Sequence, residues 1–347
     1  MTDEITILSE FPSGEREAHL WEESQWWAVQ AARAANRPLL IRGEPGVGKT
    51  QLAYAAAKRM NRPIVPFTVD SNTEARDLLW SYDAVQRLAE AQVAQTLYPD
   101  PNELRRRIAV REFVTPGPVW WGINFASAKQ QLTGTQSDDQ SPSCQIMPEE
   151  PPGWKVTDGV VILIDEIDKA DSDVPNGLLE AFGKRQFRPQ GMDKPVAAEA
   201  DGSPPLIIIT TNEERMLPDA FVRRCLVLPL KLPVCLNPDG SPPDAETELK
   251  FIDYLVERGK AHFGELLPVT QIEIAARSLM EDRRRAILDN QKPFPGQAEY
   301  LDFLRAISVL AKEFMAADPA ATEVSVYQRI SEHIQSFVFD KSAGIVQ

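Results

Sequence analysis

One short stretch of the chain combines glycines with a lysine and a threonine at a spacing suited to binding phosphate. It reads Gly43-Glu-Pro-Gly-Val-Gly-Lys-Thr50 and matches the pattern G-x-x-x-x-G-K-S/T in full. Glycines let successive backbone N–H groups converge on phosphate oxygens, and the positive end of a following helix points at the same place. We expect Lys49 to reach the β- and γ-phosphates and Thr50 to bind Mg²⁺ through its hydroxyl. The expected nucleotide-binding residues are Gly43, Glu44, Pro45, Gly46, Val47, Gly48, Lys49, Thr50 and Gln51.

A second stretch, Val160-Val-Ile-Leu-Ile-Asp-Glu-Ile-Asp168, is an apolar run that ends in two adjacent carboxylates. Asp165 is placed to bind Mg²⁺ as a Walker B acid does. Glu166 is placed to polarise the attacking water, so the pair favours hydrolysis of ATP over static nucleotide binding. Asp168 and Lys169 are expected to form a surface pair.

The elements that must position these residues can be predicted from apolar periodicity. Short β-branched runs predict buried strands of a parallel sheet, and apolar residues at helical spacing predict helices between them. The expected strands cover residues 38–42, 64–69, 160–164 and 206–211. The expected helices cover residues 15–35, 50–60, 75–95 and 176–182, followed by 244–263, 270–289, 297–317 and 322–337. The alternation predicts an α/β P-loop NTPase fold, an αβα core with a parallel sheet, followed by an all-α domain.

Composition limits the classes of function. The chain has 347 residues and a formal net charge of −14, which disfavours non-specific binding to duplex nucleic acid. Part of that acidity falls in three segments rich in Pro, Gly and Ser, residues 133–155, 189–205 and 237–246, so the argument against DNA is weakened. No apolar run is long enough to span a bilayer, and the N-terminus lacks a signal-peptide pattern, so a cytoplasmic location is expected.

Three stretches together resemble AAA+ ATPases of the MoxR group. They are the phosphate loop, the segment Ile-Asp-Glu-Ile-Asp-Lys-Ala ending at Ala170, and Thr210-Thr-Asn-Glu-Glu-Arg-Met-Leu-Pro-Asp-Ala-Phe-Val-Arg-Arg224. The resemblance implies an AAA+ core over residues 1–233 and an α-helical lid over 234–347. It also implies a ring, usually a hexamer, that binds ATP between subunits and uses Mg²⁺.

The resemblance carries further site residues. Asn212 corresponds to sensor 1, a polar side chain at a strand end that holds the water or the γ-phosphate. Arg224 matches the arginine finger supplied to a neighbouring subunit, and it is favoured over Arg223 because it directly precedes the next apolar strand. The match weakens at sensor 2, where Glu299 stands near the usual arginine and Lys292 is a possible substitute.

Two insertions are expected, at about residues 100–158 and 186–205, where the MoxR group has a helix-2 insert and a hairpin. In a ring both tend to face the pore, where Trp120 and Trp121 could grip a protein or could instead be core. The basic runs 105–107 and 283–285 each have acids nearby, so a solvated or subunit-contact face is favoured over a DNA track.

The resulting prediction is an ATPase that remodels or activates a protein partner, which by resemblance could carry a von Willebrand factor A domain. One alternative is a nucleic-acid-directed AAA+ motor or loader. Another is a nucleotide-dependent assembly scaffold with little turnover. A GTPase is disfavoured because the Asn-Lys-x-Asp motif is missing.

Overall fold

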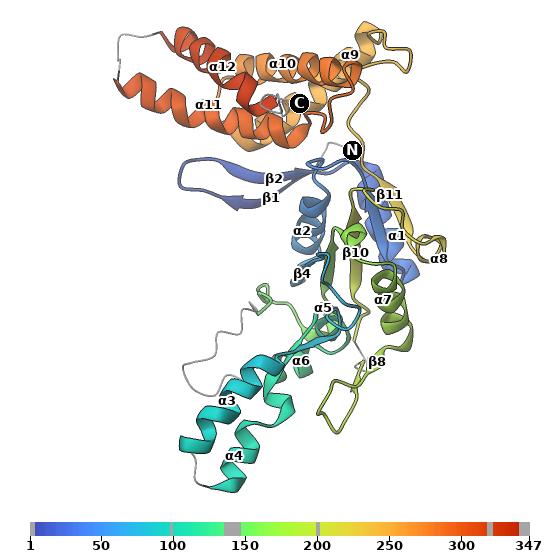
Figure 1. Ribbon diagram of the computed structural model, residues 1–347. Helices are drawn as coiled ribbons and strands as arrows, with labels where there is room; N and C mark the ends of the chain where they lie inside the picture. Colours follow the sequence, from blue (N-terminus) through green and yellow to red (C-terminus); the bar gives the residue numbers. More distant parts are fainter. Residues whose placement is uncertain (1–3, 98–99, 135–146, 199–201, 318–321, 340–347) are drawn as a thin grey trace. The chain divides into compact units, whose positions relative to one another are not determined.

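The computed structural model describes residues 4–97, 100–134, 147–198, 202–317 and 322–339 (Figure 1). Backbone contacts divide the chain into two units. The helical unit consists of Met1–Glu23, Gly43–Ala55 and Pro229–Gln347, and the sheet unit of Ser24–Arg42 and Ala56–Leu228. The chain therefore passes to the helical unit near the predicted boundary at residue 233, but the phosphate loop and the N-terminal segment are grouped with the C-terminal helices. The division into core and lid at that residue stays a prediction.

A five-stranded sheet forms the centre of the sheet unit, in the order β11-β3-β10-β7-β4. The pairs β10/β3, β10/β7 and β4/β7 are parallel. The strands are β3 (Leu39–Arg42), β4 (Ile64–Thr68), β7 (Val161–Asp165), β10 (Leu206–Thr211) and β11 (Leu226–Pro229). Every residue of β10 is buried, as expected for a central strand covered on both faces. The predicted parallel α/β fold is confirmed.

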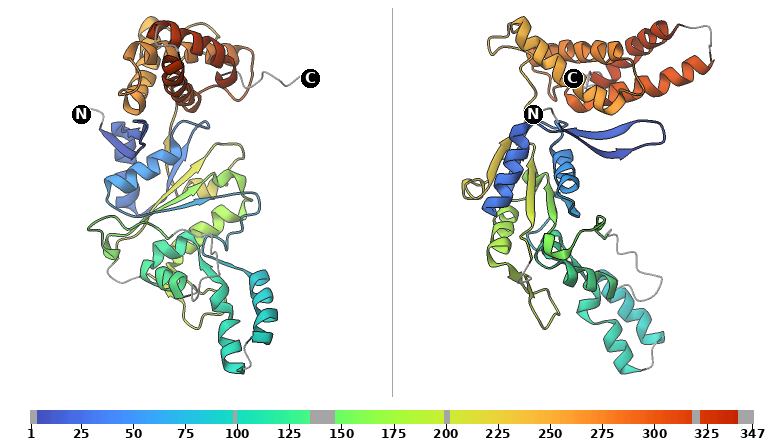
Figure 2. Two further views of the ribbon diagram at one scale, coloured as in Figure 1. Left: turned by 90° about the vertical axis from the view of Figure 1, so that its left-hand side faces the viewer. Right: turned by 180° about the vertical axis from the view of Figure 1, so that it is seen from behind.

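Helices cover the sheet of this unit, with α1 and α7 on one side and α5 on the other (Figure 2). The helices are α1 (Glu23–Ala35), α3 (Ala84–Leu97), α4 (Pro101–Arg107), α5 (Pro118–Ile123), α6 (Phe125–Gly134), α7 (Asp173–Lys184) and α8 (Asp219–Val222). Two short antiparallel pairs accompany them, β5 (Trp80–Tyr82) with β6 (Val114–Pro116), and β8 (Gln186–Phe187) with β9 (Val196–Ala197). The second pair lies within the predicted insertion 186–205.

The two adjacent tryptophans belong to the core of the sheet unit. Trp120 is 0% exposed and Trp121 3% exposed, and both pack among the apolar residues around β4 and β7. Trp120 donates its indole N–H to the hydroxyl of Ser127 at 3.2 Å. The alternative that this pair belongs to the core is confirmed, and gripping a substrate is excluded because side chains buried this completely cannot reach one.

The helical unit has a second apolar core, formed by four helices. They are α9 (Ala245–Phe263), α10 (Val269–Leu288), α11 (Gln297–Ala317) and α12 (Glu323–Phe339). An antiparallel hairpin of β1 (Ile5–Glu10) and β2 (Arg16–Leu20) contacts α9. Helix α2 (Lys49–Arg59) begins in this unit with Lys49–Ala55 and ends in the sheet unit. The four predicted C-terminal helices match those of the structure within two residues at either end.

Two predicted helices begin later than expected. Residues 16–20 are strand β2, because Phe11 and Gly14 close a turn that brings this segment back against β1, with Gly14 at a φ of 88°. Residues 80–82 are strand β5, which pairs with β6 more than thirty residues later. In both places a strand partner that periodicity alone does not reveal overrides the local helical pattern.

The predicted insertion at 100–158 is ordered over much of its length. It contains α4, β6, α5 and α6, and its residues 135–146 lie outside the described part.

Among the described residues, no helix combines the length and the apolar character needed to cross a membrane.

Candidate functional site

The phosphate loop runs from the end of β3 to the start of α2 and depends on its glycines. Gly46 and Gly48 have φ values of 78° and 89°, a region that residues with a side chain rarely adopt. A Cβ on Gly46 would lie 2.7 Å from the Cβ of Ala298, and a Cβ on Gly43 would lie 2.4 Å from the carbonyl oxygen of Leu230. The glycines are thus needed both for the turn and for close packing within the helical unit.

Lys49 is held inside its own loop. Its side chain is buried, and its ammonium donates to the carbonyl oxygens of Gly43 and Glu44, each at 2.8 Å. The Glu44 carboxylate accepts two hydrogen bonds from Arg283 of α10, at 2.8 and 3.1 Å. We call Glu44, Lys49 and Arg283 the loop cluster. Its contacts hold one cation, Lys49, and one ion pair, Glu44 with Arg283, at the loop that the sequence predicts to bind phosphate.

A second group of polar residues lies where β7 and β10 end. Thr210 on β10 donates its hydroxyl to Oδ1 of Asp165, and the same hydroxyl oxygen accepts the backbone N–H of Glu166 at 2.9 Å. Glu166 has a left-handed backbone with φ 59° and ψ 46°, which turns the chain sharply after β7. We call Asp165, Glu166, Thr210 and Asn212 the strand-end cluster. One threonine hydroxyl therefore links the Asp165 carboxylate to the backbone of Glu166.

The Glu166 carboxylate has a partner on each oxygen. Asn212 donates its amide N–H to Oε1 at 3.2 Å, and Lys169 donates to Oε2 at 2.5 Å. The hydrogen bond to Glu166 raises the pKa of Lys169, so this ammonium stays charged at neutral pH. The structure thus brings together the predicted base and the predicted sensor.

Asp168 and Lys169 do not form the predicted surface pair, because Lys169 contacts Glu166 instead. Asp168 is only 2% exposed, and its carboxylate accepts the backbone N–H groups of Asn212 and Glu214 at 3.3 and 2.9 Å. It therefore fixes the loop that carries Asn212. The sequence did not reveal this role of Asp168 or the role of Thr210. Each is a polar residue close to the end of a buried strand, and that position was the available signal.

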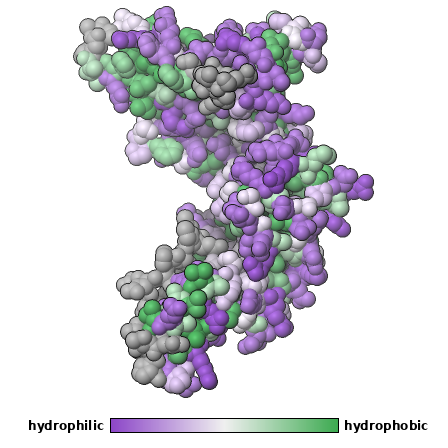
Figure 3. Space-filling model, in the orientation of Figure 1, coloured by the Kyte–Doolittle hydropathy of each residue, from purple (hydrophilic) through white to green (hydrophobic). Residues whose placement is uncertain are grey.

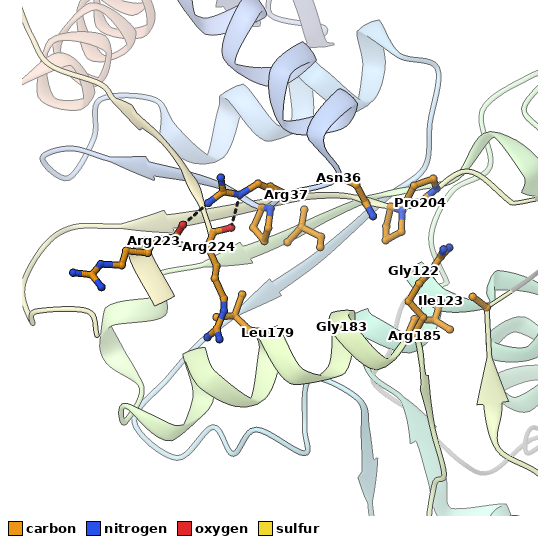
Figure 4. Close-up of a pocket in the computed structure, with 14 residues that line it drawn as sticks. Asn36, Arg37, Gly122, Ile123, Leu179, Gly183, Arg185, Pro204, Arg223 and Arg224 are labelled. Carbon is orange, nitrogen blue, oxygen red and sulfur yellow. Dashed lines mark hydrogen bonds between the residues drawn. The ribbon is translucent and has the colours of Figure 1, made fainter. Parts of the chain in front are cut away.

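The two predicted finger arginines follow α8 and are exposed. Arg37 donates from its guanidinium to the carbonyl oxygens of Arg223, Arg224 and Cys225, and the contacts to the first two are drawn in Figure 4. Arg223 and Arg224 border a cavity of about 440 Å³. Pro38, Leu179 and Ile207 also line this cavity. Arg37 thereby fixes the backbone that presents both arginines.

The start of α11 approaches the phosphate loop, whereas Lys292 lies before it. Lys292 is exposed, with its ammonium 6.0 Å from the centre of the Phe294 ring. Glu299 accepts the backbone N–H of Gly296 at 2.9 Å and so caps the helix. The amide nitrogen of buried Gln297 lies 3.7 Å from where a Cβ on Gly48 would be. Sequence reasoning did not single out Gln297, because an isolated glutamine at a helix start carries no motif.

Neighbouring acids pair with arginines of both basic runs, but in the first run two arginines share one glutamate. Arg106 and Arg107 both bind Glu103 on the same helix. In the second run, Arg284 binds Glu248 and Arg285 binds Asp282. Arg283, only 6% exposed, is not part of a solvated face as predicted, because it points into the helical unit toward the loop.

Both predicted Mg²⁺ ligands, Thr50 and Asp165, carry side-chain oxygens. Within the described residues, no group of three or more His, Cys, Asp or Glu side chains could hold a metal by itself. Mg²⁺ that accompanies a nucleotide needs only one or two protein oxygens besides phosphates and water. The Thr210 hydroxyl fixes the orientation of the Asp165 carboxylate, so this residue fits such a role.

Comparison with known proteins identifies a family over the middle of the chain. Residues 38–225 match the AAA domain (dynein-related subfamily). No curated protein matches the chain. Among solved structures, the Holliday junction branch migration motor RuvB of Thermotoga maritima has 13% identity and a TM-score of 0.41, covering 90% of this chain and 67% of that one. A variant of the same motor gives a TM-score of 0.43 at the same identity and coverage.

Proposed function

Because the chain belongs to the AAA domains of the dynein-related subfamily, we propose that it is an Mg²⁺-dependent ATPase. The observation that carries this proposal is the strand-end cluster. A metal-binding carboxylate, a neighbouring base and a sensor amide are linked there through the single hydroxyl of Thr210 and the Glu166 side chain. A protein that only binds nucleotide has no need of a base held beside the metal ligand.

The proposed division of roles follows the chemistry of each side chain. Lys49 and the backbone N–H groups of the loop bind the phosphates, and Thr50 and Asp165 hold Mg²⁺. When bound, Mg²⁺ neutralises charge on the phosphate oxygens. Lys49 must then exchange its bonds to the carbonyls of Gly43 and Glu44 for bonds to phosphate. Those two bonds keep the ammonium desolvated and placed within the loop beforehand.

In the proposed reaction Glu166 takes a proton from the attacking water. Asn212 orients the carboxylate, since its amide N–H already binds Oε1. Lys169 pairs with Oε2 of the same carboxylate. Both oxygens of the proposed base are therefore already held by neighbouring side chains.

The test of turnover is Glu166→Gln. We expect MgATP to bind with an affinity within about threefold of the parent, while hydrolysis falls by about a hundredfold or more. Glu180→Gln is the matched control, because Glu180 is an exposed glutamate of α7 whose ion pair, among the described residues, is with Lys184 of its own helix. Unchanged turnover in Glu166→Gln would remove this residue from the mechanism.

We propose further that Arg224 acts on ATP bound to a neighbouring subunit of a ring, with Arg223 as the alternative. An arginine supplied in trans offsets the charge that develops on the transferred phosphoryl group. Arg37 supports this role because its bonds to three successive carbonyls fix the segment that carries both side chains. A hexamer is the assembly that the resemblance to MoxR ATPases suggests.

Mixing experiments test action in trans. Arg224→Ala and Lys49→Ala subunits are each expected to be inactive alone and to recover part of the activity when mixed, because intact sites then form between unlike subunits. Arg223→Ala in place of Arg224→Ala separates the two candidates. Mixtures without any recovered activity, in either pairing, would argue against a finger in trans.

The proposed work of the ATPase is remodelling of a protein partner. Helix α3 supports this, since Val85, Leu88 and Val93 are all more than half exposed at positions that share one helical face. Figure 3 shows apolar side chains gathered over the region of α3 and α4. A von Willebrand factor A domain as the partner rests on the resemblance alone. Replacing the three residues by serine should abolish stimulation of ATPase activity by the partner and leave basal turnover unchanged.

A nucleic-acid motor is the rival reading. Each arginine of the second basic run pairs with an acid, and two of the three in the first run share Glu103. This pairing supports the rival less than unpaired basic runs would. ATPase activity stimulated severalfold by duplex DNA, with a steep loss of stimulation between 50 and 200 mM salt, would favour the rival. A scaffold would instead assemble with ATP and show the same slow turnover in the parent and in Glu166→Gln.

A further inference from the structure

The phosphate loop contains a carboxylate, which is the wrong charge for a loop that binds anions. Glu44 follows the first glycine, and its side chain is 50% exposed. Unpaired, it would repel a triphosphate held by the same loop. Its partner comes from a distant part of the chain, since Arg283 lies on α10 of the helical unit, 239 residues away.

Arg283 is fixed on several sides. One guanidinium nitrogen, Nη2, contacts both Glu44 oxygens at 2.8 and 3.1 Å, and the other, Nη1, donates to the carbonyl oxygen of Pro295 at 2.8 Å. The guanidinium carbon lies 5.9 Å from the centre of the Phe294 ring. With only 8% of its side chain exposed, Arg283 has little solvent to replace a lost carboxylate.

The same end of the helical unit also packs on the loop without charge. Ala298 lies so close to Gly46 that a Cβ there would meet it at 2.7 Å, and Gln297 lies beside Gly48. The loop is thus shaped by α11 at its glycines and by α10 at its glutamate. The ion pair is the only one of these contacts that also changes the charge of the loop.

We propose that Arg283 is a positioning residue of the phosphate loop, which neutralises Glu44 and holds the loop in the shape that accepts phosphate. It acts through Glu44 and not by touching phosphate, because its two guanidinium nitrogens already bind Glu44 and Pro295. The part of this inference that concerns nucleotide rests on the proposed function. The part that concerns the shape of the loop does not.

The first test needs no nucleotide. Amide hydrogen exchange over residues 43–49 is compared in the parent, Arg283→Met and Arg285→Met. We expect exchange of the loop to accelerate about tenfold or more in Arg283→Met, because a buried charge-assisted contact is lost. Arg285→Met should leave it unchanged, since Arg285 lies two residues further along and, within the described residues, forms its ion pair with Asp282 of its own helix. Unchanged loop exchange in Arg283→Met overturns the proposal.

Arg283→Lys guards against a variant that fails to fold. Lysine keeps the charge but makes a single point contact in place of the guanidinium fork, so loop exchange should fall between the parent and Arg283→Met. Circular dichroism and the thermal unfolding midpoint verify that each variant retains the folded helices.

The second test separates neutralisation of Glu44 from direct binding of phosphate. Affinity for MgATP is measured in a Glu166→Gln background, where turnover does not interfere. Arg283→Met should weaken binding about tenfold, and the double variant Glu44→Gln/Arg283→Met should return to within about threefold of the background, because the unpaired carboxylate is gone. If Arg283 touched phosphate itself, the double variant would stay as weak as Arg283→Met, which overturns the proposal.

The two tests also distinguish failure of this inference from failure of the proposed function. A parent protein without affinity for MgATP refutes the proposed ATPase, yet the exchange experiment still decides whether Arg283 shapes the loop. Tight binding by the parent together with equal affinity in Arg283→Met refutes the inference and leaves the ATPase intact.

Discussion

The strand-end cluster and the loop cluster both hold carboxylates, but they do so by different means. At the ends of β7 and β10, the Thr210 hydroxyl binds Asp165 and the Asn212 amide binds Glu166, and both donors are neutral; Lys169 adds one charged donor on Glu166. In the phosphate loop, the Glu44 carboxylate is bound by the guanidinium of Arg283. Neutral donors orient a carboxylate and leave its charge available to a metal or a proton, whereas an arginine cancels that charge.

The difference fits the tasks proposed for the two clusters. A metal ligand and a base must keep their negative charge, so an arginine on either would oppose the chemistry. The negative charge of a carboxylate inside an anion-binding loop must be neutralised, so neutral donors alone would not suffice. Lys169 is the exception in the first cluster, because it places one cation on the proposed base.

The largest expected effect comes from removing the cation of the loop cluster. Lys49→Met should weaken MgATP binding by at least about a hundredfold, because the loop loses its one ammonium aimed at phosphate. Lys58→Met is the control, an exposed lysine on the same helix. The measurement is calorimetric titration with MgATP. Equal affinities for the two variants would show that Lys49 does not bind the nucleotide.

The next effect is expected in the strand-end cluster. Thr210→Val keeps the shape of the side chain but removes the hydroxyl that binds Asp165 and the Glu166 N–H. Turnover should fall roughly thirtyfold, with the affinity for MgATP changed less than threefold, because the groups that act on the water lose their support. Thr210→Ser restores the hydroxyl and should restore most of the rate. A loss of binding equal to the loss of rate would contradict the separation of tasks.

A smaller effect tests the support of Asn212. Asp168→Asn removes the acceptor of one of two backbone N–H groups at a side chain that is only 2% exposed, so the free energy of unfolding should fall by about 2 kcal/mol. Asp171→Asn is the control, since the Asp171 side chain is 90% exposed. Urea denaturation measures both. Equal stabilities of the two variants would show that Asp168 does not hold the loop.

The smallest effect is expected from Lys169, the cation that pairs with the proposed base. Lys169→Met frees Oε2 of Glu166, and turnover should rise about twofold to fivefold, the scale of a partly exposed ion pair. Because its folded-state pKa is raised, the pair stabilises the fold at neutral pH, and this stability is lost only as pH rises above the ordinary lysine range. A rate that falls would instead make Lys169 a supporting residue of the reaction.

Much of the sheet unit could be predicted from the sequence. The strand ending in Asp165 and the one ending before Asn212 each begin with an apolar run, and the polar residues that follow mark the strand ends. Parallel strands place such ends on one edge of a sheet, which brings Glu166 and Asn212 together. The strands at 16–20 and 80–82 could not be predicted this way, because their short segments owe their form to a partner strand.

Sequence alone determined the chemistry: a glycine loop with Lys49, and carboxylates at the end of a buried strand, are local patterns whose spacing is fixed by backbone geometry. Tertiary structure decided how those charges are held. Arg283 appeared in the sequence as one of three arginines on a helix, and only folding buried it against Glu44. The physical reason is that an ion pair depends on distance in space and on exclusion of water, and neither is set by separation along the chain.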